Sequence, residues 1–371
     1  MNRSTSRSYR RALLVLSAKL LLGGLSALVA QPVPRGTISG RVLDDSTRTP
    51  LPSVNVFIVN STMGAATDLQ GRFVIRSVPI GTHEIIASIV GYAPHSQVVG
   101  LTDTTERRIE IRLRSRIIQF EPVEVIAPDD AEWRSNLEEF TTRFLGPREN
   151  APHCKILNPE VLDFSRPHAG RLEARARSPL LIENAALGYR LYLLLQRFIF
   201  DGRWIEVAWK GMFEELTPAD EEQREEWGER RERAYSGSLQ HFLSSLAQGT
   251  VKKEGFRVFL LGTRTPWNQA FAGFPIDEED VLSPGSTSNE RILRFQRYMH
   301  VQSEHERPEI ISPVRRRGYP MASWIMLNRD SVTINLMGQC VEPFALRVMG
   351  DWAREGVADA MPADYRPESK R

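Results

Sequence analysis

Residues 67–81 read TDLQGRFVIRSVPIG, and this stretch decides the fold of the first part of the chain. Asp68 and Gly71 mark a tight turn, and Phe73 and Ile75 then alternate with polar residues as in a half-buried β-strand. Segments with the same alternation lie at 37–43, 54–59 and 109–113, and residues 83–90 form a mostly apolar strand. Strands this short and close together cannot cover their apolar faces as one sheet, so the pattern predicts a β-sandwich.

Residues 36–114 carry an ordered series of glycines, prolines and apolar residues. Its members are Gly40-x-Val42-x-Asp44, Thr49-Pro50-Leu51, Val54-x-Val56, Gly64, Thr67-Asp68, Gly71-x-Phe73-x-Ile75, Pro79-x-Gly81 and Gly91-Tyr92. This series resembles the carboxypeptidase regulatory-like domain, a prealbumin-like β-sandwich with a carbohydrate-binding-like classification. The module also resembles the N-terminal extension of outer-membrane nutrient receptors, in which residues 121–126 would be the following strand. Too few residues follow for the plug and barrel of such a receptor, so we do not expect a receptor.

The first 30 residues have the pattern of a secretory signal peptide. Four arginines precede an apolar stretch at 12–30 that only Lys19 and a few small residues interrupt, and the composition changes at Gln31. We expect cleavage after Ala30 and export to the periplasm or cell surface; an uncleaved anchor is the alternative, which Lys19 disfavours. Five bases and no acid lie in this segment, so the rest of the chain has 43 bases and 46 acids. We therefore expect no nucleic-acid-binding surface, and no membrane span after the signal peptide.

The second half of the chain predicts an α+β domain. Helical spacing of apolar residues begins at Trp133, and the acidic residues after Thr217-Pro218 begin a long helix whose apolar stripe ends at Leu246. Asp201-Gly202 indicates a two-residue hairpin turn between alternating strands. The predicted strands are 189–195, 205–209, 256–261, 292–301, 324–327 and 332–336, with the last two joined through 328–330. We expect a largely antiparallel sheet.

Four segments resemble an uncharacterised region that follows the regulatory-like domain in many exported bacterial proteins. They are residues 154–160, 182–189, 235–242 and 346–365. The whole chain is thus similar to proteins named for their carboxypeptidase-like regulatory domain. That resemblance implies an architecture and supplies no catalytic residue.

No motif for a known reaction is present. A zinc carboxypeptidase needs His-x-x-Glu and a distant histidine, but none of the seven histidines has a glutamate three places later. These histidines are His83, His95, His153, His168, His241, His300 and His305. His241 shares a predicted helix with Tyr235 and Ser238, so a catalytic base there is the alternative to a packed or capping histidine. We expect no peptidase activity.

Four further features have a functional and a structural interpretation. Asp277–Asp280 is a calcium site or a solvated acidic loop, and Arg315–Arg317 is an anion site or part of a turn. Trp204 and Trp209, with Tyr189 and Tyr192, form a sugar-stacking platform or pack in the core. Cys154 and Cys340 form a disulfide or remain two buried thiols. We favour the structural interpretation in each case.

The sequence thus predicts an all-β prealbumin-like sandwich followed by an α+β domain with a largely antiparallel sheet. The expected divisions are a signal peptide at 1–30, the sandwich at 31–127, a linker at 128–130, the α+β domain at 131–365 and a tail at 366–371. We expect a non-enzymatic exported binding or scaffold protein of the periplasm or cell surface. No catalytic, metal or cofactor residue is assigned, and the expected partner is a cell-envelope protein or glycan. The alternative is an enzyme, a hydrolase, with its site in residues 131–365.

Overall fold

The computed structural model describes residues 34–115, 131–168, 170–202, 204–262, 273–305, 321–342 and 344–367. In these ranges no helix is both long and apolar enough to cross a membrane. The predicted boundary at 128–130, the segment 121–126, Arg315–Arg317 and the residues before Pro34 lie outside the described residues.

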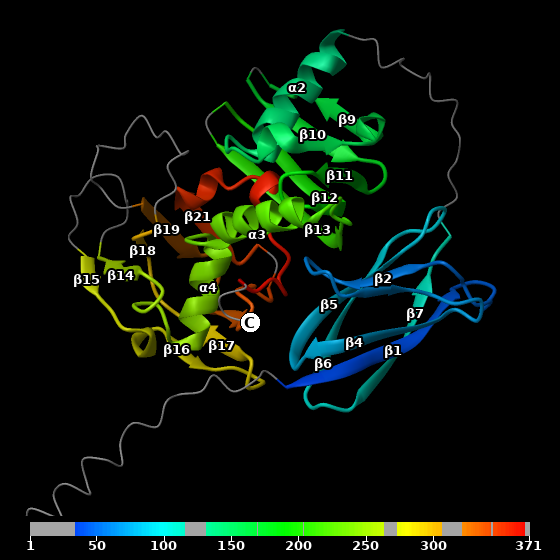
Figure 1. The fold of residues 1–371 in the computed structure, drawn as a ribbon, viewed down its shortest axis with the longest axis horizontal. Helices are drawn as coiled ribbons and strands as arrows, with labels where there is room; N and C mark the ends of the chain where they lie inside the picture. Colours follow the sequence, from blue (N-terminus) through cyan, green and yellow to red (C-terminus); the bar gives the residue numbers. More distant parts are fainter. Residues whose placement is uncertain are drawn as a thin grey trace, which may run out of the picture. The chain divides into compact units, whose positions relative to one another are not determined.

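The first seven strands form the predicted sandwich, drawn in blue and cyan in Figure 1. One sheet has the order β4-β1-β7 and the other β3-β2-β5-β6. The strands are β1 (Arg35–Asp44), β2 (Asn55–Ile58), β3 (Gly64–Ala66), β4 (Arg72–Pro79), β5 (Gly81–Ser88), β6 (His95–Leu101) and β7 (Glu106–Leu113). β1 pairs antiparallel with β4 and parallel with β7, and the other pairs are antiparallel. The sequence prediction of the sandwich is confirmed.

The sandwich has a core of its own. Phe73 and Ile75 are 2% exposed and pack with Ile38, Val56 and Ile85, which have no exposed surface. All members of this cluster come from residues 38–113. Burying one such side chain contributes about 1.5–3 kcal/mol, so the alternation in the sequence accounts for the stability of this layer.

A six-stranded antiparallel sheet forms the first part of the α+β region. Its strands are β8 (Cys154–Ile156), β9 (Leu162–Ser165), β10 (Leu172–Ala176), β11 (Leu180–Asn184), β12 (Tyr189–Phe200) and β13 (Ile205–Glu215). β10 and β11 pair with different parts of β12, and β13 pairs with the other side of β12, so β13 is an edge strand.

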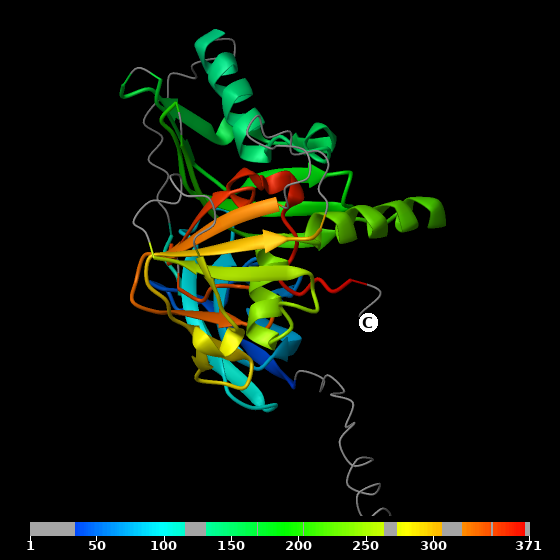
Figure 2. The same ribbon diagram turned by 90° about the vertical axis from the view of Figure 1, so that its left-hand side faces the viewer.

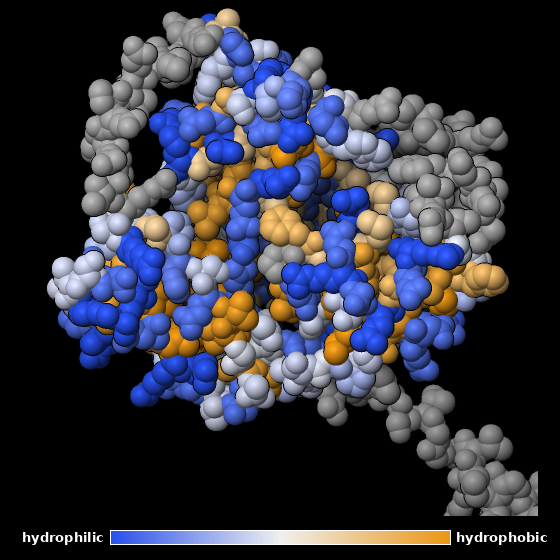
Figure 3. Space-filling model, turned by 180° about the vertical axis from the view of Figure 1, so that it is seen from behind, coloured by the Kyte–Doolittle hydropathy of each residue, from blue (hydrophilic) through white to orange (hydrophobic). Residues whose placement is uncertain are grey.

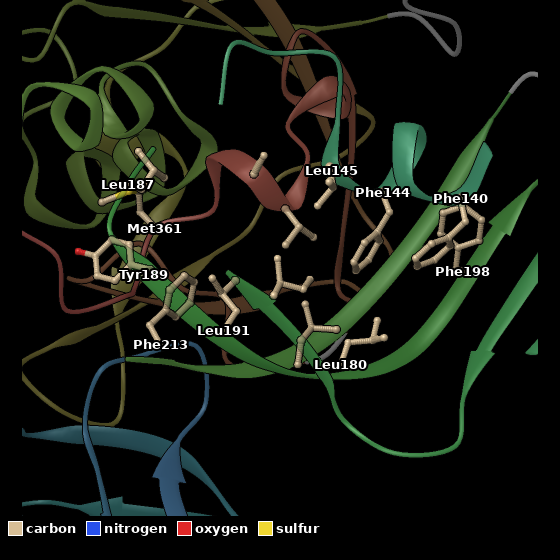
Figure 4. Packing of buried hydrophobic residues seen from close by; sticks show 14 of the residues in the cluster. Phe140, Phe144, Leu145, Leu180, Leu187, Tyr189, Leu191, Phe198, Phe213 and Met361 are labelled. Atoms are coloured by element: carbon tan, nitrogen blue, oxygen red, sulfur yellow. The ribbon is translucent and has the colours of Figure 1, made fainter. Parts of the chain in front are cut away.

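Helix α2 (Ala131–Leu145) covers one face of this sheet (Figures 1 and 2). Phe140 and Phe144 point from α2 onto Phe198 of β12, as Figure 4 shows, with ring centroids 4.6 and 6.3 Å from that of Phe198. These three rings are at most 1% exposed. The predicted helix and the predicted hairpin β12–β13 are therefore confirmed, and they share a core.

The single long helix predicted after Thr217-Pro218 is wrong, because the structure has two helices there. They are α3 (Glu221–Tyr235) and α4 (Leu239–Gln248). The chain turns at Gly237, whose φ of 72° is in the left-handed region, and the Ser238 side chain accepts a hydrogen bond from the His241 N–H to begin α4. Buried apolar residues continue at helical spacing from α3 into α4, because both helices pack against a core. The spacing alone therefore did not reveal that the helix ends between them.

The remaining strands form two antiparallel sheets, with the orders β15-β14-β18-β19-β21 and β16-β17-β20. They are β14 (Phe256–Leu261), β15 (Gly273–Pro275), β16 (Leu282–Pro284), β17 (Glu290–Leu293), β18 (Tyr298–Ser303), β19 (Met321–Leu327), β20 (Val332–Asn335) and β21 (Leu346–Gly350). Short 3-10 helices occur at Ala151–His153, Pro159–Val161, Glu278–Asp280, Trp352–Arg354 and Val357–Asp359.

One strand prediction in this region needs correction. The strand predicted at 292–301 is divided between β17 and β18, which lie in different sheets, with Arg297 at a φ of 67° between them. The two strands predicted on either side of 328–330 are β19 and β20, and they do not pair with each other, since β19 pairs with β18 and β21 whereas β20 pairs with β17. The apolar residues of these strands fill one core, so the sequence pattern did not separate the two sheets.

Candidate functional site

The described residues form a cleft of about 1630 Å³. Ile205 and residues 207–210 of β13 line the cleft, and so do Leu346 and Val348 of β21. Asn60 and Glu84 of the sandwich also line it. Hydrophobic side chains gather around a hollow in the middle of the face shown in Figure 3. Sequence reasoning did not predict this cleft, because its walls come from segments far apart in the chain.

Large apolar side chains reach the surface at the tip of the β12–β13 hairpin. Trp204 is 58% exposed, Ile205 37% and Val207 36%, and all three line the cleft. The hairpin loop runs from Asp201 to Trp204, where the Trp204 N–H donates to the Asp201 carboxylate at 2.7 Å. The Asp201 N–H also donates to the Trp204 carbonyl at 3.1 Å, so the hairpin closes at this pair, and its turn lies one residue later than the turn predicted at Asp201-Gly202.

The four aromatic residues weighed as a sugar-stacking platform are not brought together. Tyr189 is 1% exposed and its ring packs edge-on against Phe213 at 5.7 Å, while the Tyr192 hydroxyl donates to Glu214. Burial raises the pKa of Tyr189 above its usual range. Only Trp204 and Trp209 line the cleft. Tyr189 therefore packs in the core as predicted, and the exposed aromatic surface is that of Trp204 at the tip of the hairpin.

Several charged groups that line the cleft are engaged in the fold. Lys210 forms an ion pair of 2.5 Å with Glu84, and the Asp351 carboxylate accepts from the Ala322 N–H at 2.9 Å. Glu342 accepts from the backbone N–H and the hydroxyl of Thr333 at 2.7 and 2.8 Å. These carboxylates hold strands and loops in place, so the lining offers a ligand mainly apolar surface and backbone groups.

A buried ion cluster stabilises the segment behind one wall of the cleft. The Arg148 side chain is 5% exposed and its Nε lies 3.3 Å from the Asp359 carboxylate, with Glu355 3.8 Å from another Arg148 nitrogen. Asn150 donates to Asp359 at 2.9 Å. Asp359 and Glu355 line the cleft, so this cluster fixes the wall that they form. Sequence reasoning missed it because more than 200 residues separate Arg148 from Asp359.

His241 has a partner carboxylate that sequence reasoning did not identify. Its Nε2 lies 3.3 Å from Glu254, and its Nδ1 accepts a hydrogen bond from the Gly237 N–H at 3.0 Å. The His241 ring is 3% exposed and packs between Tyr235 and His305, at centroid distances of 4.9 and 5.2 Å. Both ring nitrogens therefore hold the α3–α4 junction in place, and His241 does not line the cleft.

Two other histidines are buried. His83 lines the cleft, but its Nε2 is 2.7 Å from the Pro79 carbonyl, and burial lowers its pKa against the opposing effects of that carbonyl and of Glu290. His300 stacks on Trp324 with centroids 5.2 Å apart, and burial lowers its pKa to about 4. The others are placed elsewhere: His95 is half-buried, and His153 and His168 are exposed.

The acidic segment Asp277–Asp280 forms a capped 3-10 helix. The Asp277 side chain and the backbone N–H of Asp280 form one half of a capping box, and the Asp277 N–H donates to the Asp280 carboxylate at 3.0 Å in the other half. Glu278 accepts from the Val251 N–H and Lys252 pairs with Asp277. In the described part of the chain, no group of three or more histidine, cysteine, aspartate or glutamate side chains is placed to hold a metal ion.

Cys154 and Cys340 are separate free thiols. The Cys154 Sγ contacts the Asn150 carbonyl oxygen, whereas the Cys340 Sγ contacts the Glu342 carbonyl oxygen, each at 3.4 Å. Burial raises the pKa of each thiol to about 12. Each packs against a different hydrophobic core, which agrees with the interpretation of two buried thiols.

Residues 38–125 match the family model of the CarboxypepD_reg-like domain. The chain therefore carries a carboxypeptidase regulatory-like domain, as its residue series predicted. No curated protein matches the chain.

Three solved structures illustrate how limited the structural likenesses are. A cohesin–X-dockerin complex from Acetivibrio cellulolyticus matches with 26% identity over 21% of this chain and 56% of that chain, at a TM-score of 0.19. The pilus 2b backbone protein of group B streptococcus matches with 17% identity over 22% and 42% of the two chains, at 0.19. A protein of Bacteroides uniformis proposed to bind carbohydrate matches with 9% identity over 82% and 100%, at 0.20. Scores this low establish neither a common fold nor a common function.

Proposed function

We propose that the protein is an exported, non-enzymatic binding component of the cell envelope and that the cleft holds its ligand. The observation that carries the proposal is the composition of the cleft lining. Its apolar side chains are exposed, whereas several of its charged side chains already bind other groups of the fold. Trp204, Ile205 and Val207 expose apolar surface and line the cleft, whereas Lys210 and Asp351 make contacts within the fold. Binding sites combine such apolar surface with a few polar groups that fix orientation.

The alternative of a hydrolase in residues 131–365 has less support. A hydrolytic site needs a nucleophile or an activated water beside a base. The closest candidate pair, His241 and Glu254, lies outside the cleft lining and uses both imidazole nitrogens in the fold. The N-terminal charge and apolar pattern supports export, and export supports an envelope ligand, a polypeptide or a glycan.

Hydrogen–deuterium exchange on the purified full chain tests this proposal. The probes are carboxymethylated casein for polypeptides, and cellohexaose and chitohexaose for glycans. We expect at least one probe to slow exchange in residues 204–210 and 346–350, and mass spectrometry to recover that probe unchanged. Trp204→Ala is expected to weaken binding at least about fivefold, because it removes exposed aromatic surface.

Phe274→Ala is the matched control, since Phe274 is 75% exposed and does not line the cleft. It should leave binding unchanged. Recovery of shortened probe chains would contradict the proposal and favour the hydrolase. Equal losses in both variants, or protection only outside the cleft, would remove the cleft as the site.

A further inference from the structure

The edge of β13 is divided into a paired half and an open half. In the paired half, the Asn60 N–H donates to the Gly211 carbonyl at 2.6 Å and the Phe213 N–H donates to the Ser61 carbonyl at 3.0 Å. Ser61 and Met212 form a parallel β-bridge. The turn that follows β2 of the sandwich thus adds to this edge as a very short strand. The fold itself shows that β13 accepts an added segment through backbone hydrogen bonds.

The open half is Ile205–Trp209, which lines the cleft. Backbone groups of successive residues point to opposite sides of a strand, and Gly211 and Phe213 point outward toward the sandwich turn. β13 is regular here because the register shift between Leu195 and Arg197 is on β12, so Ile205, Val207 and Trp209 also point their N–H and C=O groups outward. Among the described residues, none forms a backbone pair with these outward groups, since β13 pairs only with β12 in the named sheets.

The side chains of the same three residues provide an apolar surface beside the open edge. Ile205 and Val207 are about one-third exposed, and Trp209 is half-buried against Phe213. Exposed apolar edge strands are sites of strand addition, and proteins usually block them with charges, prolines or bulges. The outward positions of β13 carry none of these between 205 and 209.

A second strand that lines the cleft restricts what can reach this edge. β21 lines the same cleft, and it too is the last strand of its sheet. A second copy of this chain would have to bring β12 and the rest of its own sheet with its β13. A single extended segment brings only one strand, which occupies less than 5 Å in the hydrogen-bonding direction. An extended polypeptide therefore fits this cleft better than a second copy.

We propose that the open half of β13, residues 205–209, binds an extended polypeptide segment by β-strand addition. Backbone hydrogen bonds to Ile205, Val207 and Trp209 hold the segment, and the apolar wall selects small apolar side chains on alternate residues. Lys210, Asp351 and Glu342 of the lining are engaged in the fold, so an uncharged segment suits the site. This inference rests on the proposed binding role of the cleft, and it names the ligand class.

A peptide with single backbone N-methyl groups tests this inference without changing the protein. The probe is a synthetic acetylated heptapeptide amide of alternating threonine and valine, titrated into the full chain by calorimetry. In an added strand only every second N–H of the peptide donates to β13. N-methylation should therefore weaken binding at least about tenfold at alternate positions and leave the intervening positions within about twofold. Equal effects at all positions, or no binding of the parent peptide, would overturn the inference.

Substitution at the centre of the open edge provides the second test. Val207→Pro removes one outward N–H and should weaken peptide binding at least about tenfold, because proline cannot donate to an added strand. Val207→Ala keeps that N–H while trimming the side chain, and it should lose about threefold or less. Similar losses in both variants, with circular dichroism spectra like that of the unchanged protein, would mean that the side chain and not the backbone is recognised.

Glycan probes separate this inference from the proposed function. If cellohexaose or chitohexaose protects residues 204–210 while the peptide does not bind, strand addition fails and the binding role of the cleft stands. If peptide and glycans both leave the cleft unprotected, both proposals fail. If the peptide binds and is cleaved, strand addition stands and the non-enzymatic role fails.

Discussion

Gly71 and Asp68 show at the level of single residues how the sequence determines the sandwich. Gly71 has a φ of 70°, and a Cβ added there would lie 2.6 Å from the Val42 carbonyl oxygen. The Asp68 carboxylate accepts hydrogen bonds from the Gln70 and Arg72 N–H groups at 2.9 and 2.8 Å. Both residues were recognisable in the sequence because a turn has local requirements. Gly81 differs, because an added Cβ would meet nothing closer than 3.8 Å.

Gly71→Val is predicted to lower the melting temperature of the full chain strongly, since it combines a left-handed φ with a collision against backbone. Asp68→Ala should cost less, about 1 kcal/mol, because two exposed hydrogen bonds are lost. Differential scanning calorimetry measures both, with and without calcium. A stability of the unchanged protein that depends on calcium and loses this dependence in Asp68→Ala would make the turn a metal site and contradict the structural interpretation.

His300 makes stability depend on pH. Burial lowers its pKa from 6.5 to about 4, so the unfolded chain binds more protons than the folded one between these values. The contribution of neutral His300 to the unfolding free energy is complete above about pH 6.5. It is lost as the pH falls toward 4, and the total loss is on the order of 3 kcal/mol. The burial of His83 acts in the same direction.

His300→Phe keeps a ring against Trp324 and removes the titrating group. Chemical denaturation between pH 7 and 5 should show a smaller loss of unfolding free energy in this variant than in the unchanged protein. His153→Phe is the control, since His153 is exposed. Identical slopes for His300→Phe and the unchanged protein would contradict the assigned cause.

Among the elements, short-range patterns predicted strands and helices better than their pairing. The alternation in β12 and β13 and the spacing in α2 specify those elements, because side-chain direction follows backbone period. The break between α3 and α4 depends on which core each helix meets, whereas β19 and β20 fill one core from two different sheets. The pairs Arg148–Asp359 and His241–Glu254 were missed for the same reason, since only the folded chain brings them together.

Packing between α3 and the start of β12 offers a test at this scale. A Cβ on Gly188 would lie 2.3 Å from the Trp227 ring, and the Trp227 indole N–H donates to the Ala185 carbonyl at 2.8 Å. Gly188→Ala should therefore lower the unfolding free energy by more than about 2 kcal/mol. Gly170→Ala is the matched control, because its φ of 77° is similar and an added Cβ meets nothing within 4 Å.

Urea denaturation measures the unfolding free energy of both variants. Gly170→Ala introduces backbone strain alone, whereas Gly188→Ala introduces backbone strain and a steric clash with Trp227. The left-handed backbone costs about 1–2 kcal/mol in both variants. Only Gly188→Ala must also displace a buried ring. Equal destabilisation of the two variants would mean that Trp227 moves without cost and does not anchor α3.

For the whole molecule, the sandwich has its own core and several contacts to later residues. Asn289 donates to the Ile80 carbonyl, the Thr82 N–H donates to Glu290 at 2.7 Å, and the Thr62 N–H donates to Asp364 at 2.9 Å. We predict that residues 31–127 fold alone, because the core cluster needs no other segment. Dispersed amide NMR signals and a cooperative melt are expected. Random-coil shifts would show that these contacts are required for folding.

The N-terminal segment determines where the whole molecule is found in the cell. We predict that the form purified from the cell envelope begins at or near Gln31, because charge and composition change there. Intact-mass measurement checks this. A mass that includes Met1 would contradict cleavage.

Amide exchange at single residues of β13 tests the central claim most directly. The N–H groups of Ile205, Val207 and Trp209 point away from β12, whereas those of Glu206 and Ala208 point toward it. In the free full chain, the first three amides should exchange quickly and the other two slowly. Saturation with the alternating threonine–valine peptide should slow the first three at least about tenfold. Outward amides that are already protected in the free protein, or that exchange equally fast in the saturated complex, would contradict the claim that this edge is the binding site.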